Sequence, residues 1–229
     1  YIKAKHTDGD VKMGGKVELD FLLSGQGNQR VSNSVSPRLR HAYLDFNNFR
    51  FGQTWTAFQN TSSIPESASF LGLSDGMIFI RQPIIQYKSG PWQLSLENGN
   101  TTVTPTAGGR IEADGNVLPD GVIRYNSSGS FGNVSIAAIG RELRIDTAGI
   151  DDKTTGWGVS VSGRLNVGEK SDLRFGFTGG EGVGRYIGLN AVNAAAVDAN
   201  GELEAIPVYG GHIALRVPVA EATRVSVGY

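Results

Sequence analysis

Residues 38–55 read RLRHAYLDFNNFRFGQTW and alternate between apolar and polar side chains with a period of two. One row is mostly apolar and contains Ala42, Leu44, Phe46, Phe49, Phe51 and Trp55. The opposite row contains His41, Tyr43, Asp45, Arg50, Gly52 and Thr54. Successive side chains of a strand point to opposite faces, so the stretch predicts two strands joined by a turn at Asn47-Asn48. One oily face and one charged face are typical of the wall of a membrane β-barrel.

The same alternation recurs along the chain and predicts about twelve strands. They are expected near residues 1–6, 11–23, 37–46, 49–55, 77–88, 91–99, 120–126, 131–141, 156–166, 171–180, 206–217 and 222–229. Long connections are expected at 24–36, 56–76, 100–119, 142–155 and 181–205, and the remaining connections are short turns. Short turns at one end and long loops at the other are typical of outer-membrane barrels. We therefore expect residues 1–229 to form a single all-β domain, an antiparallel transmembrane β-barrel.

Composition restricts the class of protein further. A length of 229 residues suits one all-β domain, and no run approaches the about 18 apolar residues of a membrane-spanning helix. A net charge of -1 argues against a nucleic-acid partner, because a nucleic-acid-binding domain is usually strongly basic. The chain has no cysteine, which excludes disulfides and thiolate metal sites. No cofactor is expected.

Five short motifs carry a resemblance to a known family. They are RHAY at residues 40–43, FGQTW at 51–55, IPES at 64–67, IRQPIIQY at 80–87 and LEN at 96–98. In order and spacing, over roughly residues 11–98, the chain resembles the DcaP-like porins. The resemblance implies a homotrimeric, sixteen-stranded channel in the outer membrane of a Gram-negative bacterium, which conducts small anionic solutes such as dicarboxylates. Such a channel would contact outer-membrane lipid and lipopolysaccharide.

The number of predicted strands differs from the number that the resemblance implies. Twelve strands are fewer than sixteen, and the chain begins in what looks like the family's second strand. We therefore expect a partial sequence, with one strand missing before Tyr1 and several after Tyr229. The alternative is a complete twelve-stranded barrel, since even strand numbers from eight upward occur. Val225, Val227 and Tyr229 favour this alternative, because they are typical of an aromatic-ended last strand.

The direction of the basic side chains follows from the alternation. A Lys or Arg that faces lipid near the middle of the membrane costs about 2–4 kcal/mol, so a basic residue inside a strand should point inward. The residues predicted to face the lumen on this basis are Lys12, Lys16, Arg50, Lys88, Arg124, Arg164, Arg174, Arg216 and Arg224. Arg38 and Arg40 share the parity of outward Ala42 and Leu44 and are expected outside the pore. Because acidic residues in the predicted strands are fewer, the lumen is predicted to be net positive and to favour anions.

Residues 56–76 are the expected constriction loop, because the resemblance places this segment where the third long loop of porins folds into the barrel. Its Glu66 and Asp75 are expected to bind wall arginines such as Arg50 and Arg81. Opposite charges across a narrow gap would orient a passing carboxylate. The base of the loop should also bring His41, Tyr43 and Arg81 to the pore, although the direction of Arg81 is ambiguous because Pro83 permits a bulge or an irregular start of the strand.

An outer-membrane barrel hydrolase is one alternative. It would need a serine nucleophile, with His41 or His212 as its base. Ser160 and Ser162 lie in a stretch that lacks the G-x-S-x-G motif, so no serine is favoured. We therefore expect no catalytic residue and no enzymatic activity.

A soluble carbohydrate-binding β-domain is the other alternative, because a β-sandwich also has many short strands and glycine-rich turns. Such a domain could use Asp114 and Asp120 for calcium, although their spacing does not match an EF-hand loop. The three histidines are far apart in sequence and form no metal-binding motif, so no metal site is expected. The regular alternation of short and long connections favours the barrel.

Overall fold

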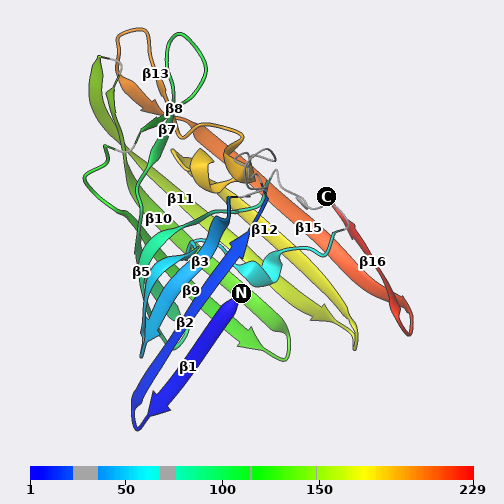
Figure 1. Cartoon of the computed structure of the whole chain (residues 1–229). Coiled ribbons are helices and arrows are strands. Elements are labelled where there is room, and N and C mark those ends of the chain that lie inside the picture. The colour runs from blue at the N-terminus through cyan, green and yellow to red at the C-terminus, as the bar shows by residue number, and fades with distance from the viewer. Residues whose placement is uncertain (23–35, 68–75, 114, 148) are drawn as a thin grey trace, which may run out of the picture.

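The computed structural model describes residues 1–22, 36–67, 76–113, 115–147 and 149–229 (Figure 1). Its main element is a sheet of twelve strands in the order β1-β2-β3-β4-β5-β6-β9-β10-β11-β12-β15-β16, and every neighbouring pair is antiparallel. The strands are β1 (Ile2–Asp8), β2 (Val11–Asp20), β3 (Arg38–Phe46), β4 (Phe49–Trp55), β5 (Arg81–Ser89), β6 (Trp92–Glu97), β9 (Asp120–Gly129), β10 (Gly132–Thr147), β11 (Ile150–Val167), β12 (Ser171–Glu181), β15 (Pro207–Ala220) and β16 (Thr223–Gly228). The twelve predicted strands and their antiparallel order are confirmed.

The sheet curves into a trough, and two connecting segments lie on its concave side (Figure 1). The first inner segment is the part of the β4–β5 connection at residues 56–67 and 76–80, and it contains the short helix η1 (Thr61–Ser63). The second inner segment is residues 183–190 between β12 and β15, with helices η3 (Gly184–Tyr186) and η4 (Gly188–Asn190). We call the face of the sheet that they cover the inner face.

The inner face carries an apolar cluster where these segments pack on the wall. Its buried members are Ala57, Phe58, Ile78, Val122, Ala137, Ile139, Val183, Tyr186 and Ile187. The predicted strand at 77–88 therefore begins later than expected, at Arg81, because Ile78 forms a bridge with Ile187 instead of continuing β5. Apolar side chains thus hold both segments against β9 and β10.

The outer face is apolar and exposed. Along β10, Ile136 is 56% exposed, whereas its neighbours Ser135 and Ala137 are buried on the inner face. Phe177 and Leu96 are 56% and 53% exposed in the same orientation on other strands. A continuous band of this kind marks a surface that contacts membrane or another protein. Among the described residues no helix is long and apolar enough to cross a membrane.

A second, smaller sheet stands beyond one end of the wall (Figure 1). It has the order β14-β13-β7-β8, with β7 (Thr101–Thr104), β8 (Ile111–Ala113), β13 (Ala195–Val197) and β14 (Leu203–Ala205). The predicted long loop at 142–155 is wrong, because β10 and β11 continue through it as a hairpin in which Thr147 pairs with Ile150. Leu143 and Ile145 are fully buried against the smaller sheet, and this packing extends the hairpin beyond the wall.

A β-bulge reverses the predicted direction of two arginines. In the β2–β3 register Glu18 pairs with His41, but the next residue of β2 pairs with Leu39, which leaves Arg40 as an extra residue in β3. Arg40 donates to the Glu18 carboxylate at 2.7 Å on the inner face, and Arg38 lies on the same face. The expectation that Arg38 and Arg40 point outward is wrong, because the bulge shifts the alternation by one residue.

Candidate functional site

The first inner segment crosses the inner face of the sheet through a series of hydrogen bonds. The Ala57 backbone N–H donates to the Glu97 carboxylate on β6 at 2.7 Å. The Asn60 side chain donates to Asn133 Oδ1 on β10 at 2.9 Å. Further along, Arg174 on β12 donates to the Ile64 carbonyl at 2.5 Å. The segment therefore follows the wall from β6 to β12 and brings its acidic residue to the arginines of the last strands.

Close packing at His212 and at two glycines determines how the first inner segment runs along the wall. The His212 ring Nε2 lies 3.0 Å from the Ser63 carbonyl, and the ring sits over Gly176, where a Cβ would collide with it. A Cβ at Gly76 would in the same way collide with the backbone of Gly211. Small residues on wall and segment therefore allow the two backbones to approach closely.

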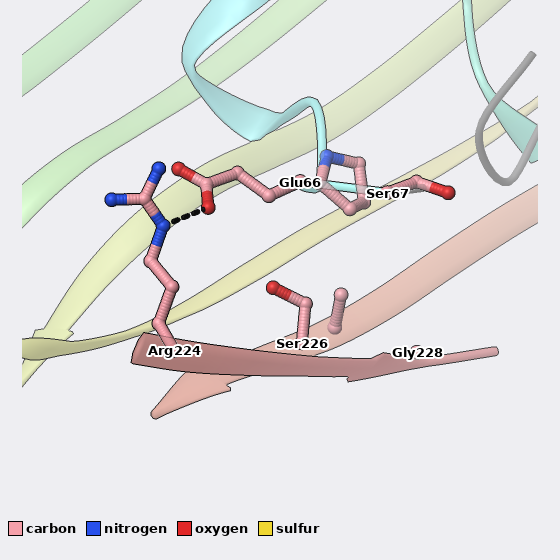
Figure 2. Close-up of a pocket in the computed structure, with 7 residues that line it drawn as sticks. Glu66, Ser67, Arg224, Ser226 and Gly228 are labelled. Atoms are coloured by element: carbon pink, nitrogen blue, oxygen red, sulfur yellow. Dashed lines mark ion pairs between the residues drawn. The ribbon is translucent and has the colours of Figure 1, made fainter. Parts of the chain in front are cut away.

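Glu66 is the acid at the end of this path, and it binds three wall arginines. Its Oε2 lies 2.6 Å from Arg224 Nε, and its Oε1 lies 2.9 Å from Arg216 and 3.9 Å from Arg174. Figure 2 shows Glu66 and Arg224 pointing toward each other across a pocket of about 490 Å³ that is also lined by Ser226. The expectation that Glu66 binds Arg50 and Arg81 is wrong, because the segment runs along the wall to β12, β15 and β16. Asp75 lies outside the described residues.

Asp172 is the second carboxylate of this cluster, and it was missed by the sequence interpretation. It accepts a hydrogen bond from Arg174 Nε at 2.8 Å and pairs with Arg216, with which it is in register across β12 and β15. Its side chain is only 3% exposed. Three arginines thus share the two carboxylates of Asp172 and Glu66, so the cluster keeps an excess of positive charge.

Three further basic residues lie on the inner face without an acidic partner in the described part of the chain. Arg164 on β11 stands opposite Arg174, and its Nε is buried without a hydrogen-bond partner. Lys88 on β5, Gln93 on β6 and Arg124 on β9 are in register with one another. Arg124 donates to Gln93 Oε1 at 2.8 Å and to a backbone carbonyl of the first inner segment, so only neutral oxygens contact it.

A separate charge cluster lies on β2 and β3. Lys16 binds Glu18 at 2.5 Å, Arg40 binds Glu18 at 2.7 Å and Asp20 at 2.9 Å, and Arg38 binds Asp20 at 2.6 Å. Three cations again meet two carboxylates. The Arg38 and Arg40 contribution was missed from the sequence, because a bulge leaves no mark in an alternating pattern.

Arg50, Tyr43 and His41 lie beside this cluster on β3 and β4. Arg50 binds Asp45 at 2.6 Å, and its guanidinium stacks over the Tyr43 ring at 3.9 Å. The His41 ring is buried, and its Nδ1 lies 2.9 Å from the Thr54 hydroxyl. The structure therefore brings these three residues together, with the charge of Arg50 largely neutralised.

Arg81 differs from the other candidates. In the β4–β5 register Arg81 pairs with Trp55. Its side chain belongs to the same row as Pro83 and exposed Ile85, whereas buried Gln82 belongs to the inner row. The guanidinium lies 3.4 Å from the centre of the Trp55 ring. The register places Arg81 in the row opposite Gln82, and its role as a lumen residue stays a prediction.

Of the two suggested calcium ligands, Asp120 lies in the described part of the chain. Asp120 is fully buried and binds Arg141 at 3.2 Å, with both side chains 0% exposed. Asp114 lies outside the described residues. Within the described ranges no group of three or more His, Cys, Asp or Glu side chains is placed to hold a metal ion.

Comparison with known proteins defines the class. No protein-family model matches the chain, and no curated protein matches it. Two solved structures with a similar fold are outer-membrane proteins, and the chain is an outer-membrane β-barrel protein.

The particular likeness is to the crystal structure of the outer membrane channel DcaP of Acinetobacter baumannii. That structure has a TM-score of 0.76 and 25% sequence identity over 98% of this chain. The chain spans 62% of the length of the DcaP chain. OmpT, an outer membrane protein of Vibrio cholerae, has a TM-score of 0.50 at 15% identity, which shows the fold alone. The resemblance to the DcaP-like channels that the motifs predicted is confirmed.

Proposed function

We propose that the protein is an outer-membrane porin, a passive diffusion channel for small anionic solutes such as dicarboxylates. The observation that carries the proposal is the excess of basic side chains on the inner face. Arg174, Arg216 and Arg224 share two carboxylates, and the described residues contain no acidic partner for Arg164 or Arg124. A pore lined by Lys and Arg favours anions. The likeness to a channel supports the proposal independently.

The path that we propose passes along the arginine cluster. A carboxylate would meet Arg224 and Arg216 beside Glu66, then Arg174 and Arg164, which are cross-strand partners. Each contact must be weak enough to release the solute, and the acidic neighbours meet this requirement by competing for the same guanidinium groups. Lys88 and Arg124 supply further positive charge on β5 and β9. No covalent chemistry is needed, so no enzymatic activity is proposed.

The first inner segment is proposed as the constriction loop within residues 56–76. It carries Glu66 against the wall arginines, so opposite charges meet inside a partly enclosed space, where a field orients a passing anion. We also propose one porin domain over residues 1–229, assembly as a homotrimer, and contact with outer-membrane lipid and lipopolysaccharide. The likeness to an outer membrane channel supports the contact with the membrane, and the homotrimer rests on the family resemblance of the sequence motifs.

The barrel hydrolase is not favoured by the geometry. His41 Nδ1 contacts a threonine hydroxyl, and His212 Nε2 contacts the backbone carbonyl of Ser63. Within the described ranges neither ring is hydrogen-bonded to a serine hydroxyl. The carbohydrate-binding domain is not favoured either, because the calcium ligand suggested for it, Asp120, is buried in an ion pair with Arg141.

The experiment that tests the proposal is the reversal potential of the full-length protein in a planar bilayer under a salt gradient. We expect anion selectivity, with the current blocked in a concentration-dependent way by an added dicarboxylate. Cation selectivity would show that acidic residues neutralise the wall, and it would overturn the proposal. A bilayer with no conductance would also overturn it, and fatty-acid release from phospholipid would then test the hydrolase.

A further inference from the structure

The second inner segment is joined to the first by backbone hydrogen bonds. The Phe79 N–H donates to the Tyr186 carbonyl at 3.1 Å, and the Gly188 N–H donates to the Met77 carbonyl at 3.0 Å. Ile78 and Ile187 lie between these two bonds as an antiparallel bridge. Two connections that are about a hundred residues apart in the sequence thus form one hydrogen-bonded unit inside the trough.

The Tyr186 ring is the centre of the apolar cluster that this unit forms with the wall. The residue is 0% exposed, and its ring meets the edge of the Phe58 ring with centroids 5.9 Å apart. Val122 and Ile139, from β9 and β10, belong to the same cluster. Burial of this much apolar surface holds both segments against the inner face of the wall.

The Tyr186 hydroxyl belongs to a buried network of hydrogen bonds next to this apolar cluster. It donates to Asp120 Oδ2 at 2.7 Å and accepts from Gln82 Nε2 at 2.7 Å. Gln82 also donates to Glu97 at 2.6 Å and accepts from Arg185 at 2.6 Å. Burial raises the pKa of the Tyr186 phenol well above its usual value, so the hydroxyl stays a donor.

The same network reaches the first inner segment. Glu97 accepts from the Ala57 N–H at 2.7 Å and from the Ser95 hydroxyl at 2.7 Å, in addition to Gln82. The wall residues Gln82, Glu97 and Asp120 therefore contact Ala57 of one segment and Tyr186 of the other. A buried network in which every member has its partners is rigid, and the loss of one member is felt by the others.

We propose that residues 183–190 are a second constriction segment, and that Tyr186 is the positioning residue that locks it to the first. The proposal rests on the protein being a channel. It goes beyond the single constriction loop of the proposed function, because the two segments cover the apolar wall of β9 and β10 together. The solute path is thereby confined to the side of the lumen that carries Arg164, Arg174 and Arg216.

The first test asks whether the two segments are in contact in the membrane. The chain has no cysteine, so the double substitution Ile78→Cys with Ile187→Cys introduces one isolated pair. The backbone hydrogen bonds lie on either side of Ile78 and Ile187, so these two residues form a non-hydrogen-bonded pair of an antiparallel ladder. The Cα atoms of such a pair are about 4.5 Å apart, which is within the range that a disulfide can bridge. We expect oxidation to cross-link the full-length protein in outer membranes, seen as a gel shift that a reductant reverses. The pair Ile78→Cys with Ile136→Cys is the control and should not cross-link, because Ile136 is 56% exposed on the outer face of the sheet.

The second test asks what Tyr186 does for the current. Tyr186→Phe keeps the ring and removes only the hydroxyl, so we expect a higher single-channel conductance, more open-channel noise and weaker solute discrimination. Tyr209→Phe is the matched control, because that tyrosine is 79% exposed on the outer face. Adding the 78/187 disulfide to the Tyr186→Phe protein should restore the wild-type current, which would not happen if the hydroxyl acted by contacting the solute itself.

Absence of the cross-link, or a Tyr186→Phe channel with wild-type conductance and noise, would overturn the inference. Neither readout depends on the sign of the permeating ion. A wild-type channel that proves cation-selective would therefore refute the proposed anion function and leave the coupling of the two segments standing.

Discussion

Arg164 on β11 and Arg174 on β12 lie directly opposite each other in the antiparallel ladder. Like charges in this position destabilise a sheet. Asp172 and Glu66 offset the charge of Arg174, whereas no acid in the described ranges lies within ion-pair distance of Arg164. The pair therefore carries more positive charge on the inner face than its acidic neighbours offset, and we expect this charge to act on a passing solute.

Arg164→Gln should reduce anion selectivity. Removing one unit charge about 4 Å from a passing anion weakens the attraction between the wall and the anion by roughly 1 kcal/mol in water. This energy corresponds to a decrease of up to about fivefold in the local concentration of the anion. The anion-to-cation permeability ratio should fall by up to that factor, and less at high salt, because salt screens exposed charges. Reversal potentials at two ionic strengths measure the change. Arg144→Gln is the control, since Arg144 lies in the hairpin beyond the wall and binds Asp151; an equal effect of both variants would contradict the assignment.

Glu66→Gln should change selectivity in the opposite direction. The substitution keeps the shape of the side chain but leaves only Asp172 to offset Arg174 and Arg216, while Arg224 loses its carboxylate partner. By the same Coulomb estimate the anion-to-cation ratio should rise by up to about fivefold. Dicarboxylate block should also become tighter. Glu221→Gln, in the turn between β15 and β16, removes the same charge away from the cluster, and a shift toward cations in the Glu66 variant would refute the proposed role.

The direction of most lumen candidates could be read from the sequence, because the side-chain period of a strand is two. Arg164, Arg174 and Arg216 needed only the apolar residues beside them to be assigned to one face. Arg40 could not be assigned in this way, since a single extra residue in β3 reverses the direction of the side chains that precede His41 in the strand. Such a bulge depends on how β3 pairs with β2, and an isolated strand does not carry that information.

The hairpin of β10 and β11 shows a different limit. Residues 142–155 are predicted to be a long connection, and they contain several charged side chains. In the structure the apolar side chains of this part, Leu143 and Ile145, point inward onto the smaller sheet, and the charged ones point out. The polarity is thus inverted relative to the membrane wall, and a rule based on an oily outer face cannot recognise it.

Tyr186 was missed because no periodic pattern surrounds it. The partners that bury it come from β5, β9, β10 and the first inner segment, which are brought together only by the curvature of the sheet. One sequence signal was available. Val183, Tyr186 and Ile187 form an apolar group inside a predicted polar connection, and such a group needs a place to be buried.

Arg141→Met should destabilise the barrel strongly. Arg141 and Asp120 form an ion pair that is fully buried, and Arg141 also donates to the carbonyls of Gly182 and Asn100 at 2.8 Å each. Removing one partner of a buried pair leaves a charge without compensation, which costs about 3–5 kcal/mol. The temperature at which the folded form disappears on a denaturing gel should fall sharply. Arg144→Met is the matched control, and adding Asp120→Asn to the Arg141→Met protein should recover part of the loss; a control that loses as much stability would contradict the argument.

Val161→Arg should destabilise the protein in a membrane far more than Asn166→Arg in the same strand. Val161 is 41% exposed on the outer face, opposite Phe177, whereas Asn166 shares the inner parity of Arg164. An arginine that faces lipid near the middle of the bilayer costs about 2–4 kcal/mol, and one that faces the lumen avoids this cost. Equilibrium unfolding in urea from phospholipid vesicles, followed by tryptophan fluorescence, measures both variants against the wild type. Equal losses for the two variants would mean that the exposed band of β11 does not face lipid, because a surface in water would accept either arginine.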